Sequence, residues 1–137
     1  MRRALALAAL IAMSVAGTAD AAHWTKYVDA DGGLAWSYDS DYSYKDRATG
    51  RLVVMQAISK PSASIGPAGP GEENGVGSVV ALDCAKHNMI VMSGYKPSAP
   101  LNIKGAWRED TPKKAEGPEN QALFAAVCTQ MASVPVK

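Results

Sequence analysis

Two cysteines, Cys84 and Cys128, constrain the fold of this chain most strongly, because they lie in segments of different hydrophobic period. Val80, Leu82 and Cys84 alternate with other residues and fall on one face of a predicted strand. Cys128 lies in residues 118–133, where apolar residues recur at helical spacing. A bond between the two would fasten a helix to a sheet. It would close a loop of about 45 residues, worth roughly 4 kcal/mol in the chain-entropy model.

The first 21 residues predict that the chain is exported. Met1 and two arginines precede an apolar run over residues 4–15, and residues 19–21 (ADA) offer a signal-peptidase site. A membrane anchor is the alternative, but the run is short for a bilayer. Since no cysteine follows the run closely, we expect no lipid anchor and a product spanning 22–137, in the periplasm or secreted. Two thiols in such an oxidising compartment normally pair.

Composition limits the classes of partner. Removing residues 1–21 from a chain with 14 basic and 13 acidic residues leaves nearly equal numbers of each. Such a balance predicts no nucleic-acid binding, and no second apolar run is long enough to span a membrane. Roughly 116 residues are expected to form one domain that gains from a covalent staple.

Alternating segments predict an antiparallel sheet of about five to six strands, with one C-terminal helix packed on it. Gln56 is the one polar residue in an otherwise doubly apolar strand. Residues 60–77 are rich in proline and glycine, so we expect an exposed connector there; a binding loop is the alternative. The strands are expected over residues 23–28, 34–38, 51–58, 78–86, 88–95 and 101–107, with a short one in 39–45.

The C-terminal segment changes to helical spacing, which places the chain in the α+β class. The helix is expected over residues 118–133, with Pro118 in its first turn and Pro135 limiting its end. Its predicted apolar stripe contains Leu123, Val127 and Met131.

The cysteines could also serve in a metal site or as a nucleophile instead of a disulfide. A metal site would need Cys84, His87 and Cys128 together, but no further histidine or cysteine has a recognised ligand spacing. A nucleophile would need a free thiolate and a base. Asp39 and Asp41 could act as acids, but carboxylates in a polar segment are usually solvated. We therefore expect a disulfide, no metal, no cofactor and no catalytic residues.

The order of several short segments resembles the surface-adhesin protein E family over essentially all of residues 22–137. The resemblance implies an antiparallel sheet, a C-terminal helix and a Cys84–Cys128 bond. It also implies an adhesion role, with host extracellular matrix proteins such as vitronectin and laminin as partners. The segments that carry it are Trp24 with YVDADGG, RLVVMQAI, VVALDCAKHNMIV, GAWRED, PKK and ALFAAVC, and the spacing from LDC to AVC is the most specific of them.

The chain departs from the adhesive member of that family in two respects. It has no lipid-attachment cysteine, and residues 69–75 (GPGEENG) stand where that member has a basic stretch. We therefore expect weak vitronectin binding or none. The remaining candidates for partner binding are the basic residues of the loop before the helix, Arg108, Lys113 and Lys114.

The sequence thus predicts an exported, non-catalytic binding protein of the cell envelope. Its protein partner and its oligomeric state stay open at this point. One alternative is a periplasmic inhibitor of a secreted hydrolase such as lysozyme, which would present residues 60–77. A small-ligand or metal-binding envelope protein and an enzyme of unknown kind are the others.

Overall fold

A computed structural model describes residues 23–60, 75–96 and 99–137. The expected signal segment and most of the 60–77 connector lie outside the described residues. These described residues form a seven-stranded antiparallel sheet in the order β1-β2-β4-β5-β6-β7, with β3 also paired to β4. The elements are β1 (Trp24–Ala30), β2 (Leu34–Asp39), β3 (Tyr44–Lys45), β4 (Leu52–Ser59), β5 (Val76–Asp83), β6 (Asn88–Tyr95), β7 (Lys113–Lys114) and α1 (Pro118–Val127).

The predicted α+β class is therefore confirmed, as is the C-terminal helix. Five of the strands have at least six residues, and β3 and β7 have two each. The β5 strand includes Val76 and Gly77, so the predicted connector ends earlier than residue 77. The first strand of the first hairpin ends at Ala30, two residues later than expected, because the turn is the 3-10 turn Asp31–Gly33. The second strand begins at Leu34, as predicted.

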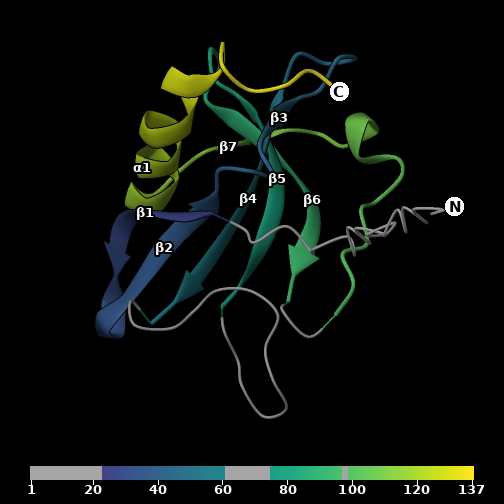
Figure 1. Ribbon diagram of the computed structural model, residues 1–137. Coiled ribbons are helices and arrows are strands. Elements are labelled where there is room, and N and C mark those ends of the chain that lie inside the picture. The colour runs from purple at the N-terminus through teal and green to yellow at the C-terminus, as the bar shows by residue number, and fades with distance from the viewer. Residues whose placement is uncertain (1–22, 61–74, 97–98) are drawn as a thin grey trace, which may run out of the picture.

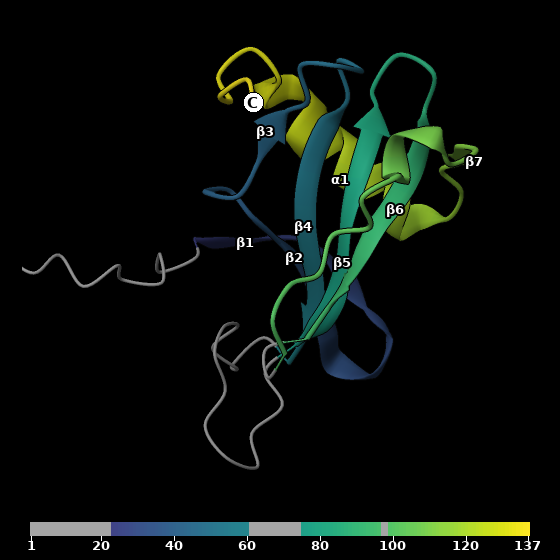
Figure 2. The same ribbon diagram turned by 90° about the vertical axis from the view of Figure 1, so that its right-hand side faces the viewer.

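The sheet is the middle of three layers. Helix α1 covers one face, and residues 99–112 cross the other (Figures 1 and 2). Because β4 is central, its residues alternate between two buried layers, which explains its continuous apolar sequence. The helix-side core contains Leu52, Val54, Val80, Leu82, Leu123, Phe124 and Val127. The core on the opposite face contains Val53, Met55, Val79, Ala81, Ile90, Met92 and Trp107.

Gln56 is buried within this central strand and has partners for both ends of its amide. Its Oε1 accepts a hydrogen bond from the Tyr27 hydroxyl at 2.8 Å, and its Nε2 donates to Ser78 Oγ at 3.2 Å. Burial raises the pKa of Tyr27, which keeps this phenol a hydrogen-bond donor. The polar residue that interrupts the apolar strand is therefore satisfied within the fold.

The predicted disulfide between Cys84 and Cys128 is present, with the two α-carbons 5.8 Å apart. Cys84 is not in a strand, however, because β5 ends at Asp83. The Asp83 carboxylate accepts hydrogen bonds from the backbone N–H groups of Ala85 and Lys86, at 3.1 and 2.9 Å. These bonds begin the turn earlier than the alternating pattern indicated.

The prediction of a strand over residues 101–107 is wrong. Residues 101–104 have no regular structure, and a 3-10 turn follows at Trp107–Glu109. Ile103 and Trp107 pack onto the face of the sheet. The segment makes a backbone hydrogen bond to β6, from the Lys104 N–H to the Met92 carbonyl oxygen at 3.0 Å, but it is not assigned as a strand. The spacing of Leu101, Ile103 and Trp107 resembles strand alternation, but Leu101 is exposed and only Trp107 is fully buried.

The final helix is shorter than predicted. It begins at Pro118 as expected, but ends at Val127 and continues as the 3-10 turn Cys128–Gln130. Leu123 and Val127 are buried as the spacing predicted, whereas Met131 lies beyond the helix and is only partly buried. Among the residues described, no helix is both long and apolar enough to cross a membrane.

Candidate functional site

An interruption between β2 and β3 creates a hollow lined by charged and aromatic side chains. Both strands pair with the same edge of β4, but residues 40–43 intervene between them and leave the ladder. The residue before this segment holds it in place, since Asp39 Oδ1 accepts a hydrogen bond from the Asp41 N–H at 2.9 Å. The Ser43 hydroxyl donates to the Asp39 carbonyl oxygen at 3.2 Å.

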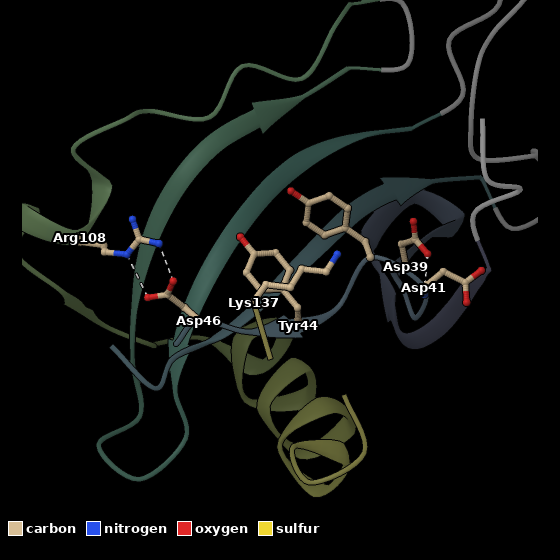
Figure 3. Close-up of a pocket in the computed structure, with 7 residues that line it drawn as sticks. Asp39, Asp41, Tyr44, Asp46, Arg108 and Lys137 are labelled. Carbon is tan, nitrogen blue, oxygen red and sulfur yellow. Dashed lines mark hydrogen bonds and ion pairs between the residues drawn. The ribbon is translucent and has the colours of Figure 1, made fainter. Parts of the chain in front are cut away.

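The hollow has a volume of about 440 Å³ and combines acidic, aromatic and basic side chains. Asp46 and Arg108 lie at one end, and Asp39 and Asp41 at the other, with Tyr44 and Lys137 between them (Figure 3). Tyr42 completes the lining. These residues come from the β2–β3 region, from the segment that crosses the sheet and from the C-terminal segment.

At the first end, an ion pair fixes Arg108 in place. Its Nε and Nη2 donate to the two carboxylate oxygens of Asp46, at 3.1 and 2.5 Å. The Asp46 side chain is 2% exposed and also accepts hydrogen bonds from the N–H and hydroxyl of Thr49. The hydrogen bond from Arg108 lowers the pKa of Asp46, so this carboxylate stays ionised. The guanidinium also lies 4.6 Å from the ring centroid of Trp107.

At the other end, Asp39 contradicts the expectation of a solvated carboxylate. The residue is only 7% exposed, although Asp41 beside it has a side chain 48% exposed. Asp41 pairs with Nδ1 of His23, which lies outside the lining of the hollow. This hydrogen bond, and then the Asp41 charge, raise the pKa of His23.

The middle of the hollow is aromatic. Tyr42 and Tyr44 lie with ring centroids 6.1 Å apart. Burial is the main cause of the raised pKa of each phenol, with a nearby aspartate contributing to both. Both phenols are therefore neutral at physiological pH.

The C-terminal segment brings a cation into this hollow. Val136 pairs in parallel with Lys45 of β3. The Lys45 N–H donates to the Pro135 carbonyl oxygen at 2.8 Å, and the Lys137 N–H donates to the Lys45 carbonyl oxygen at 2.9 Å. This pairing places the Lys137 ammonium 5.3 Å from the ring centroid of Tyr44.

The three basic residues predicted as binding candidates do not form one site. Arg108 lines the tyrosine–aspartate hollow, where Asp46 engages its charge. Lys113 and Lys114 are exposed on β7 and line a different hollow of about 480 Å³, beside Val91 of β6. Arg108 thus belongs to the tyrosine–aspartate hollow, and the two lysines belong to another surface.

Sequence reasoning missed the tyrosine–aspartate hollow. The sequence feature that could have indicated it is the group of aspartate and tyrosine residues in 39–46, DSDYSYKD, but this pattern predicts only a short polar strand. Its partner Arg108 lies 62 residues away along the chain. No local pattern joins the two.

The two cysteines are not available as metal ligands in this structure. Both sulfur atoms are bonded to each other, so neither is a thiolate. His87 stacks on Phe124, with ring centroids 5.0 Å apart. In the described part of the chain, no three histidine, cysteine, aspartate or glutamate side chains are grouped as metal ligands.

Comparison with protein-family models found no match. Comparisons with characterised proteins and with solved structures also found none.

Proposed function

We propose that this chain is an exported, non-catalytic binding protein of the cell envelope, and that the tyrosine–aspartate hollow contacts its protein partner. The observation that carries this proposal is the composition of the hollow. Two tyrosines and two carboxylates share its surface, and Arg108 is fixed at its end by Asp46. Tyrosine and well-ordered arginine side chains are enriched where proteins bind each other.

The state of Asp46 favours binding over acid–base catalysis. General acid–base catalysis is most effective when the pKa of the group lies near the operating pH. The pKa of Asp46 is instead lowered by Arg108, and four hydrogen bonds engage its two oxygens. Such a carboxylate is a weak proton acceptor, so its role is to orient Arg108.

The proposal includes export of the chain and a role in adhesion. The Cys84–Cys128 disulfide supports export, since disulfides persist in oxidising compartments. The resemblance to the surface-adhesin protein E family suggests adhesion to host matrix, and inhibition of a secreted hydrolase such as lysozyme is the alternative. The second surface, at Lys113 and Lys114, stays a candidate for either role.

Cross-linking on intact cells tests the proposal directly. A photoactivatable amino acid is placed at Tyr42 in the hollow and, as a control, at Gln121, which is exposed on α1. We expect a discrete cross-linked product from position 42 and none from position 121. N-terminal sequencing of the same material should begin Ala-His-Trp-Thr if residues 1–21 are removed.

Identification of the captured protein then separates the alternatives. Vitronectin or laminin would support adhesion, whereas a lysozyme would support the inhibitor. Equal products from both positions, or none from either, would count against the hollow as the partner surface. Retention of residues 1–21 as an anchor would contradict the expected cleavage.

A further inference from the structure

We infer that the tyrosine–aspartate hollow is a cation site, and that it receives a lysine or arginine side chain of the partner. This inference rests on the proposed function and adds the chemistry of the group that is bound. It depends on three observations, namely the carboxylate of Asp39, the aromatic surface of the hollow and the position of Lys137.

The first observation concerns charge. Asp46 and Arg108 neutralise each other through two hydrogen bonds, and Asp41 pairs with His23. Among the described residues this leaves Asp39 as the carboxylate of the lining that has no basic partner. Asp39 is more than nine-tenths buried, yet within the described residues its carboxylate accepts only the 2.9 Å bond from the Asp41 N–H. A buried carboxylate is stabilised by an opposite charge, so this end of the hollow favours a cation.

The second observation concerns the aromatic surface. Tyr42 and Tyr44 are half-buried, and both line the hollow together with Asp39 and Asp41. The face of an aromatic ring attracts ammonium and guanidinium groups, with a larger gain where water is excluded. Rings next to carboxylates therefore favour a cation with an apolar stem, which describes lysine and arginine side chains.

The third observation is that a lysine already lies in the hollow. The ammonium of Lys137 is 5.3 Å from the Tyr44 ring centroid, and it comes from the segment that pairs with β3. It is joined to the domain by a few backbone hydrogen bonds at an exposed edge. Lys137 is therefore an intramolecular example of the ligand class, and it competes with the partner side chain.

A neutral sugar is the main competing ligand class, because sugars also contact tyrosine and aspartate side chains. A sugar would leave the charge of Asp39 uncompensated, whereas a basic side chain would neutralise it. The two classes are separated by salt, since binding of a cation to carboxylates weakens as ionic strength rises.

Titration calorimetry of the purified protein with small probes tests the cation site. The probes are tetra-arginine and tetra-lysine amides, with tetra-glutamate and a tetramer of N-acetylglucosamine as controls. Asp39→Asn keeps an acceptor for the Asp41 N–H, and Asp31→Asn removes the same charge from an exposed turn outside the lining. We expect Asp39→Asn and Asp41→Asn each to weaken binding of the basic peptides about fivefold or more, and Asp31→Asn to leave it unchanged.

Two further variants test the aromatic surface and the competing lysine. Tyr44→Leu should weaken binding about threefold to fivefold, and Tyr44→Phe should retain it, because phenylalanine keeps the ring face. Lys137→Ala should strengthen binding about twofold or more, since its ammonium no longer competes. Circular dichroism of each variant confirms that the fold is kept before binding is compared.

Several results would overturn the cation site. These are equal peptide affinities for Asp39→Asn and Asp31→Asn, tighter binding of tetra-glutamate, or binding of the sugar tetramer alone. Weaker peptide binding by Lys137→Ala would show that Lys137 does not compete. If Tyr42 cross-links a partner that basic peptides fail to displace, the binding function stands and the cation site fails. If peptides bind but position 42 captures no partner, the reverse holds.

Discussion

Gly77 of β5 packs directly against the backbone of Gln56 in β4. A β-carbon at position 77 would lie 1.8 Å from the Gln56 carbonyl oxygen and 2.7 Å from the α-carbon of Ala57. The two central strands can therefore approach each other only because residue 77 has no side chain. This contact lies near the start of β5, next to the hydrogen-bonded pair of Gln56 and Ser78.

We predict that Gly77→Ala destabilises the protein by about 3 kcal/mol or more, because the atoms it meets are backbone and cannot rotate away. Gly94→Ala is the matched control, since a β-carbon there meets nothing within 4 Å. That control should change the free energy of unfolding by about 0.5 kcal/mol or less. Urea unfolding of both variants measures the difference, and similar values for the two would contradict the predicted clash.

Loss of the disulfide is predicted to cost about 4 kcal/mol in the free energy of unfolding. The bond joins residues 44 apart in sequence, and closing such a loop restricts the unfolded chain. The double variant Cys84→Ser/Cys128→Ser is compared with the oxidised protein by urea unfolding. Addition of reductant should lower the stability of the parent protein and leave the double variant unchanged. A loss under about 1 kcal/mol would contradict the chain-entropy account.

Asp46→Asn is predicted to destabilise the protein by about 2–3 kcal/mol at neutral pH, because an amide cannot accept hydrogen bonds from both Arg108 nitrogens. Asp110→Asn is the control. Asp110 also pairs with a basic residue, Lys104, but at a more exposed site, so its loss should cost about 0.5 kcal/mol or less.

The Asp46 contribution should also depend on pH. Arg108 lowers the pKa of Asp46 in the folded protein below the ordinary aspartate value of about 3.9. The stabilisation is therefore complete above that value and disappears as the pH falls through the lower folded-state pKa. Unfolding free energies measured from pH 7 down to about 2.5 should show the parent approaching Asp46→Asn only below about pH 4. A constant difference over this range would mean that Asp46 does not titrate with folding.

Asp41→Asn is predicted to lower the pKa of His23. The hydrogen bond and the charge of Asp41 raise this pKa, so the pair favours the imidazolium. The pair contributes below the ordinary histidine pKa, and its contribution disappears as the pH rises through the raised value. NMR titration of the His23 ring measures the shift, with Asp31→Asn as a charge-matched control. An unchanged titration curve in Asp41→Asn would show that the pair does not form in solution.

The sequence by itself determined those features that depend on neighbouring residues. A run that is apolar on both faces predicted β4. Alternation predicted the first hairpin, since side chains of a strand point to opposite faces in turn. Pro118 marked the start of the helix, because proline suits the first turn. The pairing of Cys84 with Cys128 also followed, because the two cysteines of the chain had only each other as partners.

Only the tertiary structure decided which polar residues meet. The polar sequence around Asp39 and Asp46 predicts that both are solvated. Both are buried, because β2 and β3 pair with the same edge of β4 and residues 40–43 leave the sheet between them. Arg108 reaches this segment from the chain that crosses the face of the sheet, and Lys137 reaches it because the C-terminal residues pair with β3. Local periodicity carries no information about such contacts, because they join segments distant in sequence. The same limit explains why residues 101–107 resembled a strand, although they cover the face of the sheet.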